Sequence, residues 1–171
     1  MGATPGRKPM RRVMACLAAP AVLLTSGCAP DPYPAPEAVA HYEDVLFQAR
    51  TILEATGIEW EDSVYRPSVV EEDGRCVYNT GSIRPVEQPE PWAVLRHPDF
   101  ESVMLPQLNQ LLTDNGFSEL GDTTVSGNGG WRTATDDHGA TFELWSDIGF
   151  RIDGVVVDAE PCTPEALGLP A

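Results

Sequence analysis

The sequence predicts an α+β domain, a two-layer sandwich in which two helices cover one face of an antiparallel sheet. Two stretches carry apolar residues at helical spacing, one from Glu37 toward Gly57 and one over residues 99–115. Between and after them the apolar residues recur with a period of two, which is typical of strands. Short turns separate the last three of these segments and therefore favour an antiparallel meander.

The two predicted helices have recognisable ends. In the first, Gly57 suits the position that follows a helix, and the inward face is formed by Val39, Tyr42, Val45, Leu46, Ala49, Ile52 and Leu53. In the second, Asp99 is a candidate N-cap, and Asn115-Gly116 ends the helix. Because proline removes a helical hydrogen bond, Pro106 predicts a kink or a restart.

The predicted strands fall on both sides of the second helix. They cover residues 58–61, 76–78, 123–126, 131–135, 141–145 and 150–157. Turns at residues 136–139 and 146–149 separate the last three, and the proline-rich residues 84–98 predict a long loop.

Composition excludes several classes of protein. The chain has 171 residues, 11 Lys+Arg against 26 Asp+Glu and a formal net charge of −15. Nucleic acid is therefore not expected as a partner, since phosphate neutralisation needs a basic face. With 42% hydrophobic residues the chain is not expected to be disordered as a whole. No apolar run approaches the 18 residues of a stable membrane span.

The N-terminus has the pattern of a secretory signal. Four cations precede an apolar stretch, residues 13–24, which closes on Thr25-Ser26-Gly27-Cys28; the cations are Arg7, Lys8, Arg11 and Arg12. This ending resembles a bacterial lipobox, although Thr25 departs from the apolar residue usual at its position. The resemblance implies that Cys28 becomes the lipidated first residue of the mature protein. The alternative is an ordinary cleaved signal peptide; Cys16 is read as part of the signal.

Four segments follow from this pattern. Residues 1–27 are the lipoprotein signal peptide, and residues 28–36, with proline at every second position from Pro30, form a tether. Such a tether favours polyproline II at about 3.1 Å per residue, which keeps the domain near the bilayer. Residues 37–162 form the folded domain and residues 163–171 a flexible tail. The expected location is the extracytoplasmic face of the cell membrane.

The two remaining cysteines, Cys76 and Cys162, are expected to form a disulfide. Two thiols in an exported domain most simply pair, because the environment outside the membrane permits disulfides. A redox or metal role is the alternative. No CxxC is present, and two thiols without clustered histidines do not complete a zinc site.

The candidate chemical groups are better explained as turns. Asp136-Asp137-His138 could act in acid–base catalysis or bind a metal, but it falls in a predicted turn before Gly139. The glycine-rich residues 126–130 lack the ending of a phosphate loop and predict a hairpin. Neither a G-x-S-x-G elbow nor an S-x-x-K motif occurs.

No cofactor and no metal ion are expected. The three histidines, His41, His97 and His138, are far apart in sequence and lack partners at ligand spacing. Three tryptophans lie in predicted strands and suit core or half-buried packing: Trp60, Trp131 and Trp145. Trp92 lies in the proline-rich loop, where it would either anchor a binding partner or close the end of the sandwich.

The whole organisation resembles small actinobacterial lipoproteins of the LppA-like type. The resemblance rests on the lipobox, the proline tether, the helix ending in Gly116-Phe117, the strand meander and the late Cys162. It implies a membrane-anchored two-layer domain and carries over lipid attachment to Cys28, but no catalytic residue.

These features predict a non-enzymatic, membrane-anchored lipoprotein of the cell envelope. Its domain would bind or scaffold an envelope protein or a small ligand, and its Cys28 lipid would contact the bilayer. The alternative is an exported hydrolase or metal-dependent enzyme assembled from scattered residues such as His97 and His138.

Overall fold

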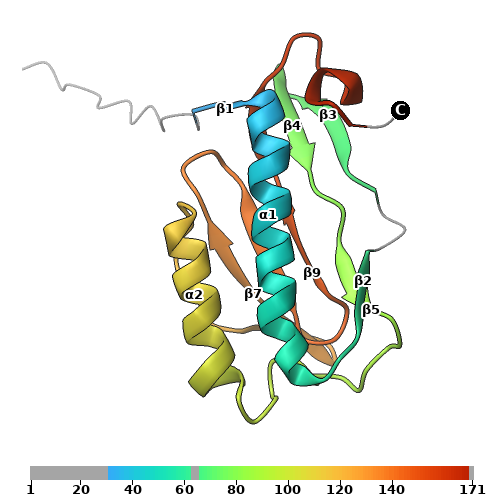
Figure 1. The fold of residues 1–171 in the computed structure, drawn as a ribbon, viewed down its shortest axis with the longest axis vertical. Coiled ribbons are helices and arrows are strands. Elements are labelled where there is room, and N and C mark those ends of the chain that lie inside the picture. The colour runs from blue at the N-terminus through green and yellow to red at the C-terminus, as the bar shows by residue number, and fades with distance from the viewer. Residues whose placement is uncertain (1–30, 63–65, 170–171) are drawn as a thin grey trace, which may run out of the picture.

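The structure, a computed structural model, describes residues 31–62 and 66–169. Two helices, α1 (Ala35–Leu53) and α2 (Leu105–Asp114), lie side by side on one face of antiparallel-rich sheets (Figure 1). The π-helical turn η2 (Phe100–Met104) leads into α2, and the 3₁₀ turn η1 (Glu54–Thr56) follows α1. The predicted α+β class, with two helices on one face of the sheet layer, is confirmed.

The strands form two sheets. The smaller has the order β1 (Tyr33–Pro34), β10 (Val155–Asp158), β4 (Arg75–Asn79) and β3 (Ser68–Glu72). The larger has the order β2 (Trp60–Asp62), β5 (Ile83–Pro85), β9 (Phe150–Asp153), β8 (Thr141–Trp145), β7 (Gly129–Thr135) and β6 (Thr124–Ser126). Among the strand pairings of the described residues, only β1–β10 is parallel. The predicted meander of the last strands is present in β7–β8–β9.

The two sheets are joined where two long segments cross from one to the other. The predicted strand over residues 150–157 is divided at Gly154 into β9 and β10, and β4 continues similarly toward β5. At the crossing the Thr80 amide donates to the Ile152 carbonyl (2.9 Å) and the Ile152 amide donates to Thr80 Oγ1 (3.0 Å). The Gly154 amide donates to Asn79 Oδ1 (2.8 Å). The side chains of Thr80 and Asn79 thus accept hydrogen bonds from backbone amides at the point where the strands change sheets.

The core lies between the helices and the inner sheet face. Most of the α1 stripe that was predicted from periodicity is buried, while Val39 and Ile52 are partly buried. The stripe packs with buried strand residues that include Phe142, Leu144, Phe150, Ile152 and Val155. Tyr42 of this stripe donates to Asp136 Oδ2 at 2.5 Å. Burial, followed by this hydrogen bond to a carboxylate, raises the pKa of Tyr42; burial, with Glu43 nearby, also raises that of Tyr78.

These tyrosines predict a loss of stability in alkali. Because the unfolded tyrosine ionises near pH 10.0 and the folded one does not, each contributes stability that is complete below pH 10.0 and declines above it. The free energy of unfolding should fall by up to about 1.4 kcal/mol per pH unit for each tyrosine. Urea unfolding between pH 9 and 12 measures the slope.

Phenylalanine variants separate the two tyrosines. Tyr42→Phe removes a hydrogen bond to a charged group and should cost about 1.5–3 kcal/mol at pH 7. The Tyr78 hydroxyl is buried and has no hydrogen-bond partner in the described part of the chain. Tyr78→Phe should therefore be neutral or stabilising at pH 7. An alkaline slope that neither variant reduces would contradict the assignment.

The predicted interruption of the second helix is confirmed, and Asp99 holds the predicted N-cap position, at the start of η2. Pro106 occupies the first turn of α2, where its missing amide is tolerated, and the chain before Leu105 forms the wider π-helical turn. The Asp99 side chain makes no capping hydrogen bond. Instead the Asp99 carbonyl accepts from the amides of Val103 and Met104.

The boundary predicted between tether and domain is wrong for residues 33–36. Tyr33 and Pro34 pair with Val157 and Asp158, and α1 begins at Ala35 rather than Glu37. Alternating prolines suit an edge strand and a first helical turn, since both tolerate a missing amide. The Tyr33 ring also packs against His41 (5.5 Å between centroids) and His138 (4.7 Å), which holds this segment on the domain.

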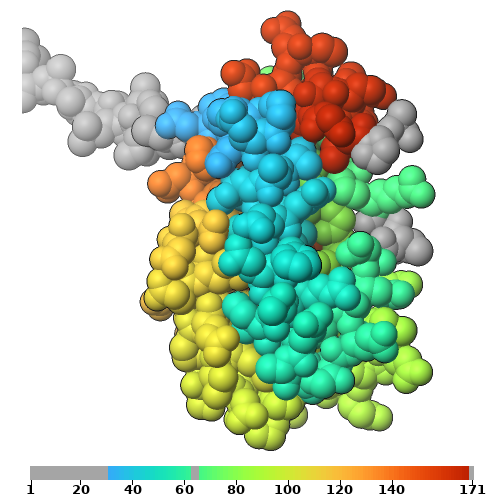
Figure 2. Space-filling view, viewed as in Figure 1, coloured from blue at the N-terminus to red at the C-terminus, as the bar shows by residue number. Residues whose placement is uncertain are grey.

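The prediction of a flexible tail is also wrong for residues 163–169, the part of that segment that the structure describes. Residues 164–167 form a 3₁₀ turn, η3, whose N-cap Thr163 accepts from the Ala166 amide. Leu167 and Leu169 are buried, and Figure 2 shows this segment gathered against the N-terminal part of α1. Such a short turn has no periodic pattern, so its two leucines gave no signal in the sequence.

Candidate functional site

Three hollows meet at Ser82, where the chain crosses between the sheets. One, of about 660 Å³, opens beside α1; two others, of about 310 and 230 Å³, also include Ser82. β3, the partner of β4, begins at Ser68, and β2, the partner of β5, ends at Asp62. Residues 80–82, which connect β4 to β5, therefore lie at the opening between β2 and β3. The two smaller hollows are here called the Ser82 groove.

Arginines gather around this opening. The described residues contain seven arginines, and four of them line the three hollows: Arg50, Arg66, Arg84 and Arg151. Arg151 lines both halves of the groove, and Arg66 lines one half and the larger hollow. The Ser82 groove is lined by three of these arginines, Arg66, Arg84 and Arg151, and by one acidic residue, Asp153. The larger hollow differs, because three acidic residues line it beside two arginines. In a chain of net charge −15 the excess of guanidinium groups in the groove favours oxyanion ligands.

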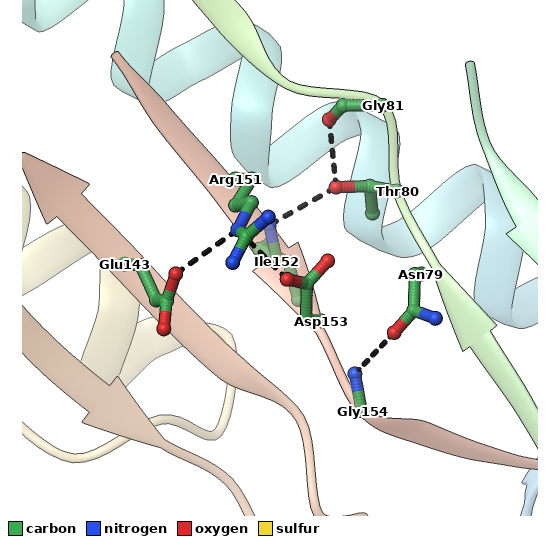
Figure 3. Close-up of polar contacts among 8 residues, drawn as sticks. All are labelled: Asn79, Thr80, Gly81, Glu143, Arg151, Ile152, Asp153 and Gly154. Carbon is green, nitrogen blue, oxygen red and sulfur yellow. Dashed lines mark hydrogen bonds and ion pairs between the residues drawn. The ribbon is translucent and has the colours of Figure 1, made fainter. Parts of the chain in front are cut away.

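Acidic neighbours orient these arginines. Arg151 Nε contacts Glu143 Oε2 at 2.9 Å and Asp153 Oδ2 at 2.7 Å, as Figure 3 shows. Arg84 contacts Glu61 Oε1 through Nε (3.1 Å) and Nη2 (2.9 Å). Exposed pairs of this kind add little stability. Their effect is to hold each guanidinium in one orientation.

Figure 3 also shows why the groove floor is well defined. Thr80 Oγ1 accepts from the Ile152 amide and donates to the Gly81 carbonyl (2.9 Å), while Asn79 Oδ1 accepts from Gly154. The Asn79 amide nitrogen is not used in that contact. Burial raises the pKa of the Asp153 carboxyl, an effect that Arg151 opposes and Glu143 increases.

An aromatic pair lies on the same sheet face. Trp131 and Trp145 are cross-strand neighbours with ring centroids 5.0 Å apart, both half-buried, as predicted for strand tryptophans. Trp60, in contrast, is fully in the core against Phe150. Trp145 lines the groove with Arg84 and Ile148. The groove therefore combines guanidinium groups with one indole ring.

The sequence-predicted site residues have different outcomes. Cys76 and Cys162 form the expected disulfide, with Cα atoms 5.3 Å apart, and it joins β4 to the segment after β10. Cys28, the predicted lipidation site, lies outside the described residues.

Trp92 packs against the hydrophobic core. It is half-buried, its Cη2 atom lies against the backbone of Gly130, and Arg96 stacks 4.4 Å from its ring centroid. Of the two roles left open for Trp92, the structure favours packing over an exposed binding anchor.

Asp136 has a structural role at the predicted turn. Its Oδ1 accepts from the amides of His138 (2.9 Å) and Ala140 (2.8 Å), while Oδ2 accepts from Tyr42. His138 Nδ1 contacts the Asp31 carbonyl at 2.7 Å, which requires the proton on Nδ1. The turn interpretation of Asp136-Asp137-His138 is therefore confirmed. Residues 126–129 likewise form the predicted hairpin, β6–β7.

His97 and His138 do not share a site. His97 precedes η2, whereas His138 follows the Asp136 bridge to Phe117, beyond the other end of α2. The five residues of η2 and the ten of α2 span roughly 22 Å at 1.5 Å per residue. The two histidines therefore lie toward opposite ends of the η2–α2 segment, and the enzyme alternative stays a prediction. Within residues 31–62 and 66–169 no group of three or more His, Cys, Asp or Glu side chains is placed to hold a metal ion.

Two features were missed in the sequence. The first is Phe47 of α1, which is 65% exposed because it lies outside the apolar stripe of the helix. The sequence does contain a signal for it, since a large aromatic residue outside the stripe is expected on the surface. The second is the Ser82 groove, which gave no local signal because its arginines come from separate segments.

No described helix is both long and apolar enough to cross a bilayer. Comparison with protein-family models, curated proteins and solved structures found no match to this chain.

Proposed function

We propose that this chain is an exported protein of the cell envelope, lipid-anchored at Cys28, whose domain binds a ligand or partner at the Ser82 groove without transforming it. The signal sequence and lipobox support export and anchoring. The Cys76–Cys162 disulfide is compatible with an oxidising compartment. The same order of lipobox, prolines and α+β domain is the basis for placing it with LppA-like lipoproteins.

The gathering of arginines carries the binding proposal. Three of the seven arginines in the described residues line the Ser82 groove together with a single acidic residue, Asp153, although acidic residues dominate the chain. Ion pairs with Glu61 and Glu143 hold two of these arginines in place. Guanidinium groups oriented before binding lose little freedom when a ligand arrives, which increases affinity.

The anchor would keep the domain close to the membrane. Tyr33 is already part of the sheet, so only the residues between Cys28 and Tyr33 link the lipid to the fold. At no more than about 3.6 Å per residue, five steps reach at most roughly 18 Å. The domain would therefore act on molecules at the membrane surface rather than at a distance from it.

The intact mass of the protein extracted from its native membrane tests the anchor. We expect a chain that begins at Cys28, carries a diacylglycerol and lacks two hydrogens because of the disulfide. A chain that begins at Met1 with free thiols would contradict both export and anchoring.

Crosslinking in living cells tests binding at the groove. A photoreactive residue at Ile148, which is 50% exposed and lines the groove, should capture one recurrent species. The matched control is Val125, an exposed apolar residue (66%) on β6 that lines none of the hollows described above. Arg151→Gln should reduce capture from Ile148. Equal capture from both positions, or capture that Arg151→Gln leaves unchanged, would contradict the proposed site.

A further inference from the structure

The chemistry of the Ser82 groove indicates the class of molecule that it binds. Arg84 and Arg151 lie on the sheet face away from the helices, beside Trp145. Both acids that contact Arg151 do so at Nε, so its two Nη groups are not used in these contacts. Guanidinium Nη groups bind carboxylate and phosphate oxygens in preference to neutral groups. The first requirement on a ligand is therefore negative charge.

The second requirement comes from the indole ring. Trp145 is held by Trp131 on the neighbouring strand, and it lines the half of the groove that also contains Ile148. A half-exposed, fixed indole offers a flat apolar surface next to the cations. A ligand that uses both features has a flat or ring-shaped apolar face and an acidic group within reach of Arg84 or Arg151.

The third requirement is length. Polar groups continue past Ser82 to Asn79 and Ser68, in the half of the groove that also contains Asp153. From Gly149 to Asp153 the floor follows four steps of strand, or roughly 13 Å at about 3.3 Å per residue. Hydroxyl, amide and carboxylate groups spread along such a distance match a chain of hydroxyl-bearing rings better than one compact anion.

We propose that the Ser82 groove binds an acidic oligosaccharide, with one ring stacked on Trp145 and its carboxylate on Arg84 or Arg151. The hydroxyl groups of the following rings then meet Ser82, Asn79 and Asp153. This inference rests on the proposed function, because it assigns a ligand to the same groove. A nucleotide, which also joins a ring to an anion, becomes an outcome of the test.

Calorimetry on the full lipidated chain in detergent micelles tests the assignment. The probe is trigalacturonate, and its neutral counterpart is maltotriose. We expect trigalacturonate to bind at least tenfold more tightly than maltotriose and to weaken as salt is added. Arg151→Gln and Arg84→Gln should each reduce its affinity about tenfold. Trp145→Ala should also weaken it, whereas Trp145→Phe should retain most of the affinity.

The control variant is Arg75→Gln, since Arg75 is exposed on β4 and lines none of the three hollows. It should leave the affinity unchanged. Absence of saturable trigalacturonate binding, equal binding of maltotriose, or an equal loss in Arg75→Gln would overturn the inference. Tighter binding of ADP or inorganic phosphate would replace the saccharide by a nucleotide or a single anion. If trigalacturonate fails while Ile148 still captures an Arg151-dependent species in cells, only the ligand class is wrong.

Discussion

Replacing Cys76 and Cys162 together by alanine should lower the free energy of unfolding by about 4–5 kcal/mol. The disulfide closes a loop with a sequence separation of 86 residues, and it restricts the unfolded chain more than the folded one. It also ties the segment that contains Leu167 and Leu169 to the sheet, so the packing of η3 against α1 should weaken as well. Urea unfolding of the oxidised protein and the double variant measures the difference.

Reduced wild-type protein is the control for this prediction. It should unfold at nearly the same urea concentration as the Cys76→Ala/Cys162→Ala variant, because both lack the crosslink. If oxidised and reduced wild-type protein unfold at the same urea concentration, the disulfide either does not form in solution or does not restrict the unfolded chain enough to add stability.

Gly149→Ala should destabilise the protein by more than about 3 kcal/mol. Gly149 has φ +125°, a region that other residues rarely adopt, and a Cβ atom there would clash with the Ile83 carbonyl oxygen. The β5–β9 pairing at Ile83 and Phe150 would have to separate to admit the methyl group. Thermal and urea unfolding measure the loss, and ligand capture at the neighbouring groove should fall with it.

Gly116→Ala is the matched control. Gly116 also has positive φ (+86°), but nothing lies within 4 Å of the position that a Cβ atom would take. This variant should cost only the conformational penalty of a left-handed residue, about 1–2 kcal/mol. Equal losses in the two variants would show that backbone conformation, rather than the contact with Ile83, determines the effect at Gly149.

The helices were predictable because their sequence signals are local, and the disulfide was predictable from the number of cysteines. The stripe that includes Tyr42, Val45 and Leu46 repeats at the helical period, and burial of one helix face requires that repeat. Pro106 marked the break before α2 because a proline amide cannot donate. Cys76 and Cys162 were the two thiols left after the N-terminal segment, so their pairing needed no knowledge of the fold.

Chain ends were less predictable because short segments are ordered by what they contact. Residues 33–36 look like a linker, yet Tyr33 is held by His41 and His138, and β10 supplies a strand partner. Leu167 is buried against a helix that lies more than 100 positions earlier in the chain. Long-range contacts of this kind override the local preference of a proline-rich or aperiodic segment.

What the sequence by itself determined is the class of fold, the amphipathic helices, the turn at Asp136 and the pairing of the cysteines. Periodicity, turn chemistry and cysteine count are properties of neighbouring residues or of the whole composition. Only the tertiary structure decided that Trp92 packs against the core and that His97 and His138 stand apart. It also decided that Arg66, Arg84 and Arg151 line one groove, because these residues come from separate segments that the fold places around Ser82 where the chain crosses between its two sheets.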